Sequence, residues 1–190
     1  MTFNPQAVEY IKNNIELVDT NNFQVLFEDV HKPLDVPVRD IVDILNEADI
    51  DPMPYLEYIP TRYLAGSRRS HKLITIPSNV FAIEGGAFTG LDVEKVVIEE
   101  GVQEIYRGVF QRNPDLKEVY LPHSLGKMNG RQFAGCFLDK IVYNGTLAEF
   151  NHIWKPRAWF SAPDEEQAAY CTLVCTDSTL TVEEYLSTYD

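Results

Sequence analysis

Three stretches of the chain align with one another without gaps: ITIPSNVFAIEGGAF (residues 74–88), VVIEEGVQEIYRGVF (96–110) and VYLPHSLGKMNGRQF (119–133). Each stretch is apolar at the same five positions. These are Ile74, Ile76, Val80, Ile83 and Phe88; Val96, Ile98, Val102, Ile105 and Phe110; and Val119, Leu121, Leu125, Met128 and Phe133. The copies are offset by 22 and then 23 residues, and a partial fourth copy begins at Ile141. Such an offset predicts a solenoid, in which each unit stacks on the next.

The template predicts a strand followed by a tight turn. Ile74 and Ile76 are two residues apart, so both would face inward from a strand, and Pro77 would end that strand. Val80 and Ile83 are three residues apart, which suits a helical or 3₁₀ turn on the opposite side of the coil. The strands of successive coils would then form a parallel sheet with a spacing of roughly 4.8 Å.

The remaining strand residues are expected to point outward in two columns. The first-position column holds the first outward residue of each strand, and its members are Leu73, Lys95, Glu118 and Lys140. The second-position column holds the second outward residue of each strand, and its members are Thr75, Val97, Tyr120 and Val142. β-Branched and aromatic side chains rarely line a face that meets water, so either a partner or the chain's own N-terminal helices should cover this one. The candidate partner-binding residues are Thr75, Lys95, Val97, Glu118, Tyr120, Lys140 and Val142.

The two ends of the chain differ from the repeats. Residues 1–54 show apolar residues at helical spacing, and Asn4 with Pro5 is a good start for the first of three short helices. We expect a helical region over 1–54, a repeat array over 55–160 with a truncated first and a degenerate last repeat, and a capping segment over 161–190. Trp154, Trp159 and Phe160 are expected to cover the open end of the array. The predicted fold class is therefore α+β, a short leucine-rich-repeat solenoid behind a helical region, with a short parallel β-helix as the alternative.

The net charge of −13 lies mostly at the ends of the chain, with −8 over residues 1–67, +2 over 68–160 and −7 over 161–190. A nucleic-acid binder needs a basic surface, so direct nucleic-acid binding is not expected. No apolar run approaches the roughly 20 residues that span a bilayer, and the first residues do not read as a signal peptide. We therefore expect a cytoplasmic protein without membrane contact.

Residue patterns for catalysis or metal binding are missing from the sequence. It contains no phosphate-binding loop, no HExxH and no nucleophile elbow. The four histidines form no pair at metal-ligand spacing, and three cysteines are too few for a disulfide framework. The sequence predicts a protein that is not an enzyme and holds no metal or cofactor.

The repeats resemble the BspA-like leucine-rich repeats, whose units run roughly LxxIxIPxxVxxIxxxAFxGC. The matching segments are residues 74–90, 97–110 and 119–136, with YIPTRYLAGS (58–67) as a truncated first repeat, 141–154 as a degenerate last one and CTLVCTDSTL (171–180) as a closing strand. Arg112 replaces the usual Gly after the Phe, Glu99 replaces the Pro, and the Asn or Cys ladder of other leucine-rich repeats is expected to be absent. Many proteins with such repeats are large and exported, and because this array is short and its first residues do not read as a signal peptide, we do not expect their adhesive role here. Short versions with helical N-terminal extensions are the kind found in bacteria and their phages.

These features predict a protein–protein interaction module that binds through the sheet face or the acidic flanks. Two alternatives stay open. One is a phage-encoded inhibitor whose acidic surface blocks a basic, nucleic-acid-binding host protein. The other is a structural assembly subunit. The sequence does not specify the partner or the oligomeric state.

Overall fold

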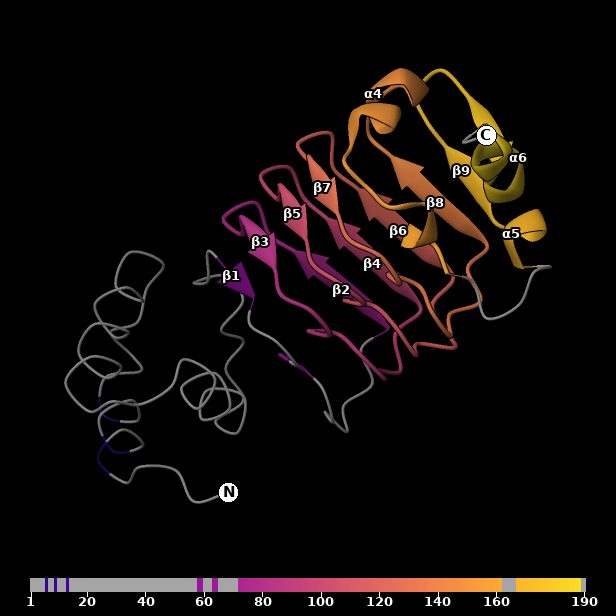
Figure 1. Ribbon diagram of the computed structural model, residues 1–190. Coiled ribbons are helices and arrows are strands. Elements are labelled where there is room, and N and C mark those ends of the chain that lie inside the picture. Colours follow the sequence, from indigo (N-terminus) through magenta and orange to yellow (C-terminus); the bar gives the residue numbers. More distant parts are fainter. Residues whose placement is uncertain are drawn as a thin grey trace.

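The computed structural model describes residues 72–161 and 167–188, together with residues 6, 9, 13, 58, 59, 63 and 64. Over residues 72–143 the chain winds into coils that contribute a strand to each of two facing sheets, and the apolar core fills the space between them (Figure 1). The molecule is a short solenoid of stacked parallel strands, which confirms the predicted fold class.

The larger sheet contains the strands that the alternating apolar pairs predicted. Its repeat strands are β2 (Leu73–Ile76), β4 (Lys95–Ile98), β6 (Glu118–Leu121) and β8 (Lys140–Tyr143). They pair in parallel and in register, so that Ile74 lies beside Val96 and Val119 beside Ile141. In each strand the second and fourth residues are buried and the other two are more exposed, as alternation along a pleated strand requires.

The opposite side of each coil differs from the prediction. It carries a second parallel sheet, made of β1 (Tyr58–Ile59), β3 (Ala82–Ile83), β5 (Glu104–Ile105) and β7 (Lys127–Met128). The expected helical or 3₁₀ turn is wrong, because the backbone groups here bond between coils and not within one coil. The Tyr106 N–H donates to the Ile83 carbonyl at 2.9 Å, and the Asn129 N–H donates to the Ile105 carbonyl at 2.9 Å.

The truncated first repeat is present at residues 58–59, where it supplies a strand to the smaller sheet. Ile59 lies beside Ile83 and is fully buried. The Glu84 N–H donates to the Ile59 carbonyl at 2.8 Å, and the Leu64 N–H donates to the Ala87 carbonyl at 3.0 Å. This segment therefore occupies the second half of a coil.

A column of aromatic rings runs through the core from coil to coil. Phe88 and Phe110 stack at 5.8 Å between ring centroids, and Phe110 and Phe133 stack at 6.2 Å. Tyr63 meets one end of the column edge-on, and Trp159 meets the other end in the same way. Each ring pair adds about 0.5–1.5 kcal/mol to the effect of burial. Because each coil contributes one ring, each coil is stable only against its neighbours.

Buried polar side chains also join neighbouring coils. The Asn113 Oδ1 accepts from the Leu91 N–H at 2.6 Å, and its Nδ2 donates to the carbonyls of Phe88 and Phe110 at 2.8 and 2.9 Å. Cys136, one repeat further on, donates from Sγ to the Phe110 carbonyl at 3.0 Å. The expectation that an Asn or Cys ladder is absent is wrong at these two positions, because their side chains satisfy carbonyls that the coils leave unpaired.

The C-terminal segment closes the larger sheet. After β8 come α4 (Leu147–His152) and the 3₁₀ helix η3 (Arg157–Trp159). From residue 167 the elements are α5 (Gln167–Tyr170), β9 (Thr172–Val174), β10 (Thr179–Thr181) and α6 (Val182–Ser187). β9 pairs in parallel with β8, and β10 returns antiparallel to β9, so residues 171–180 close the sheet as the resemblance implied.

Two of the three predicted capping aromatics cover the end of the array. Trp159 and Phe160 are buried, and Trp159 lies edge-on to Phe150 at 5.7 Å. The prediction is wrong for Trp154, which is 58% exposed. Trp154 extends the smaller sheet as a parallel bridge partner of Lys127, so its ring points outward beside the lysine.

The three predicted N-terminal helices lie outside the described residues, apart from Gln6, Glu9 and Asn13, which are helical. The domain boundaries at residues 54 and 160 stay predictions. In the part of the chain that the structure describes, no helix has the length and apolarity needed to cross a bilayer.

Candidate binding surface

The second-position column forms a continuous ridge on the outer face of the larger sheet. Thr75 lies beside Val97, Val97 beside Tyr120, and Tyr120 beside Val142. The column continues to Val174 on β9, which the sequence comparison missed because β9 lies outside the repeats. Thr75 is exposed and the other side chains are half-buried, so this ridge lies at the protein surface and not in the core of the described residues.

The first-position column carries alternating charges that pair across the strands. Lys95 and Glu118 are 3.3 Å apart, and Lys140 and Glu118 are 3.1 Å apart. Hydrogen bonds from Lys140, Tyr120 and Lys95 lower the pKa of Glu118. The pairing with Glu118 raises the pKa of Lys140. Both lysines and the glutamate are therefore charged at neutral pH, and the two lysines share the one carboxylate of Glu118.

Tyr120 connects the two columns. Its hydroxyl donates to Glu118 Oε2 at 3.0 Å. The Lys95 ammonium lies 4.3 Å from the centroid of the ring, and the Lys140 ammonium lies 5.8 Å from it. These contacts fix the orientation of a large, amphipathic side chain in the middle of the sheet face, as is typical of residues that dominate binding interfaces.

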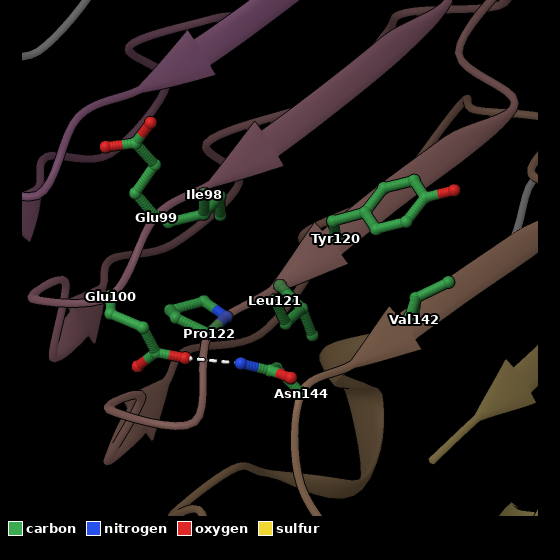
Figure 2. A pocket seen from close by; sticks show the side chains of 8 residues that line it. All are labelled: Ile98, Glu99, Glu100, Tyr120, Leu121, Pro122, Val142 and Asn144. Carbon is green, nitrogen blue, oxygen red and sulfur yellow. Dashed lines mark hydrogen bonds between the residues drawn. The ribbon is translucent and has the colours of Figure 1, made fainter. Parts of the chain in front are cut away.

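A pocket of about 290 Å³ lies at the carboxyl ends of β4, β6 and β8, directly beside the second-position column (Figure 2). Its lining residues are Ile98, Glu99, Glu100, Tyr120, Leu121, Pro122, Val142 and Asn144. Of these, only Tyr120 and Val142 were candidates from the sequence. Ile98 and Leu121 are the last residues of β4 and β6, and the other four lie in turns, whose geometry a repeat template does not specify. The signal that could have found the pocket is Glu99, which replaces the usual Pro of the repeat.

Glu100 joins three coils at this pocket. Its Oε1 accepts from the His123 N–H at 2.9 Å and from Asn144 Nδ2 at 2.8 Å, and its Oε2 accepts from the Ser124 N–H at 2.9 Å. Burial alone would raise the pKa of Glu100, but the hydrogen bonds from Asn144, His123 and Ser124 lower it on balance. The carboxylate is therefore ionised and held in one place (Figure 2).

The three cysteine thiols are poorly placed for nucleophilic chemistry. Burial raises the pKa of the Cys136 thiol to about 11 and that of Cys171 to about 12. Burial and the nearby Asp177 raise the pKa of Cys175 to about 11. These thiols are therefore protonated at neutral pH, whereas only the deprotonated thiolate is a strong nucleophile. Within the same residues, no three His, Cys, Asp or Glu side chains are grouped to hold a metal ion.

Two comparisons gave no match: no curated protein and no solved structure is significantly similar to the chain. A family model described as the BspA type leucine-rich repeat region matches residues 52–153 in six copies. The matched range begins just before β1 and ends after α4, so it covers the two sheets of the solenoid apart from β9 and β10. The chain therefore belongs to the family of proteins with BspA-type leucine-rich repeats.

Proposed function

We propose that this protein is a protein-interaction module that binds its partner through the outer face of the larger sheet. Leucine-rich repeat solenoids generally mediate protein–protein interaction and are typically non-enzymatic scaffolds. The observation that carries the proposal is the continuous register from Thr75 to Val142, which puts half-buried apolar side chains in a row on a rigid surface.

The composition of this face supports a protein ligand. An aromatic side chain, Tyr120, lies at the centre, and the charges around it are already paired. A partner that covers the row therefore meets side chains that already have an opposite charge in contact, which lowers the cost of their burial; a buried charge without a partner costs several kcal/mol. The expected interface has an apolar centre and a polar rim, as most protein interfaces do.

The first test is a substitution on the outer face of the larger sheet that leaves the fold intact. Val97→Lys adds a positive charge at a half-buried outward position, so we expect the folded monomer to persist within about 1 kcal/mol of the wild-type stability. Affinity capture with the tagged protein from its source cells should recover partner proteins with the wild type. Recovery should fall at least tenfold with Val97→Lys.

The matched control is Gln103→Lys, which adds the same charge at an exposed position directly before β5, a strand of the other sheet. This variant should recover the same proteins as the wild type. Equal loss with both variants, or no loss with Val97→Lys, would contradict binding through the larger sheet.

The salt dependence of capture separates this proposal from binding through the acidic flanks. Contacts of exposed acids with a basic partner weaken strongly between about 0.05 and 0.5 M salt, because the Debye length falls. Contacts through the second-position column bury apolar surface and should persist at high salt. Complete loss of captured proteins at 0.5 M salt would favour the flanks, and with them the proposal of an inhibitor of a nucleic-acid-binding protein.

A further inference from the structure

Glu99 and Glu100 are adjacent carboxylates in the turn that follows β4. Several other acids of the array lie against a lysine: Glu118 contacts two lysines, Glu104 contacts Lys127 and Glu94 contacts Lys72. Among the described residues, neither Glu99 nor Glu100 forms an ion pair with a lysine, arginine or histidine. Both are exposed, so a cation from outside can reach them.

Both carboxylates are nevertheless held in position by the backbone of neighbouring coils. The Ser78 N–H donates to Glu99 Oε2 at 3.1 Å, from the coil before. The N–H groups of His123 and Ser124 donate to Glu100 from the coil after. A charge fixed in this way loses little conformational entropy when a counter-charge binds, so the two acids are preorganised to accept one.

The walls between these acids and the second-position column are apolar. Pro122 and Leu121 lie between Glu100 and the side chains of Tyr120 and Val142 (Figure 2). The volume of about 290 Å³ lies at the lower limit of pockets for small molecules, which suits one long side chain better than a cofactor.

Asn144 adds a further acceptor at the end of β8. Its Nδ2 is used by Glu100, while its Oδ1 accepts no hydrogen bond from any residue in the described ranges. The ligand of this pocket therefore needs several donors, a positive charge and an apolar stem.

We propose that the pocket binds one arginine side chain of the partner protein. The aliphatic stem would pack on Pro122 and Val142, and the guanidinium would reach Glu100 and Asn144 Oδ1, while Glu99, which points away from Asn144, adds negative charge nearby (Figure 2). Arginine fits better than lysine because its five donors are spread over a plane and can serve several acceptors at once. This inference rests on the proposed function, since it names the chemistry of the partner at the same face.

The test uses N-acetyl-L-arginine amide as the probe, with the neutral isostere N-acetyl-L-citrulline amide and N-acetyl-L-lysine amide as comparisons. Two-dimensional amide NMR of the full ¹⁵N-labelled chain follows the titration at low salt. We expect millimolar binding of the arginine amide, with shifts confined to residues 98–101, 121–124 and 142–145. The lysine amide should bind at least threefold more weakly and the citrulline amide at least tenfold more weakly.

Three variants sharpen the test. Glu99→Gln keeps the acceptor for the Ser78 N–H and should weaken arginine binding about threefold. Val142→Lys places a cation at the pocket and should abolish the shifts. Glu94→Gln removes an exposed acid that pairs with Lys72 away from the pocket and should leave binding unchanged.

Three results would contradict the proposed binding site: equal binding of the arginine and citrulline amides, shifts outside the three segments, or no shifts at about 50 mM probe. Equal binding of the lysine amide would overturn its assignment to arginine. None of these results affects capture by the sheet face, which the Val97→Lys variant tests separately. The inference and the proposed function can therefore fail independently.

Discussion

Two arginines hold a backbone conformation that glycine holds elsewhere in the array. Two residues after the Phe of each repeat, Gly90 and Gly135 have φ values of 70° and 79°. Arg112 occupies the same position in the repeat between them and has a φ of 60°. Four residues earlier in the coil, Gly86 and Gly108 have φ 69° and 64°, and Arg131 has φ 63°. The left-handed region costs a residue with a Cβ about 1–2 kcal/mol, so each arginine strains its coil.

Replacing either arginine with glycine should therefore stabilise the protein. We expect Arg112→Gly and Arg131→Gly each to raise the free energy of unfolding by roughly 0.5–1 kcal/mol, because relief of the strain exceeds the extra entropy of glycine in the unfolded chain. Equilibrium unfolding in urea measures the change.

The reverse substitution is the control. Gly90→Ala should destabilise the protein by roughly 1 kcal/mol through the backbone alone, since a Cβ there would meet no atom within 4 Å. A loss of stability in the two arginine variants would show that their side chains contribute more than the strain costs.

At the residue scale, the sequence predicted the columns of the larger sheet and missed the pocket beside them. The columns follow from alternation along strands of four residues, so Val97 and Tyr120 could be placed from spacing alone. Glu100 and Asn144 are 44 residues apart and meet only because three turns stack. Turn geometry depends on local hydrogen bonds that a repeat template does not contain.

At the scale of the secondary-structure elements, the sequence did not predict the short strands of the smaller sheet. Strand β3 has two residues, Ala82 and Ile83, and both are buried, so no alternation of apolar and polar residues is visible along it. The spacing from Val80 to Ile83 then imitates a helical turn. The stacking of the coils favours the strand over the helical turn, because the backbone groups of these two residues pair with those of the neighbouring coils.

Helix α4 has an N-terminus that depends on an ionised glutamate. The N–H and hydroxyl of Thr146 both donate to Glu149 Oε2 at 2.8 Å, and His123 lies 3.1 Å from the other oxygen. These contacts, led by the Thr146 N–H, lower the pKa of Glu149 from 4.5 to about 2. The helix therefore begins on a capping box that is strengthened by charge.

This cap should make stability depend on pH in acid. A carboxyl group whose pKa is lower in the folded state stabilises fully above its ordinary pKa of 4.5, and this contribution is lost as the pH falls toward 2. Glu149→Gln should therefore be less stable than the wild type at pH 5.5, and the difference should close between pH 4.5 and pH 2. Urea unfolding of both proteins across this range measures it; a difference that stays constant down to pH 2.5 would contradict the assignment.

As a whole, the molecule is a small rigid platform whose two sheets have different outer faces. The larger sheet presents the row through Val97 and Tyr120, with both lysines of the neighbouring column in contact with Glu118 and the pocket at its edge. The smaller sheet presents Lys127 between the rings of Tyr106 and Trp154. The parallel stacking fixes both faces, so the partner is expected to meet a preformed surface and the interface backbone should move little on binding.

Oxidative footprinting of the protein with its captured partner tests the central claim most directly. Hydroxyl radicals modify exposed aromatic side chains, and Tyr120 and Trp154 report on the two faces in one sample. Binding through the larger sheet predicts that the partner lowers the modification rate of Tyr120 several-fold and leaves that of Trp154 unchanged. Protection of Trp154 with an unchanged rate at Tyr120 would show that the partner binds the other sheet and would contradict the account.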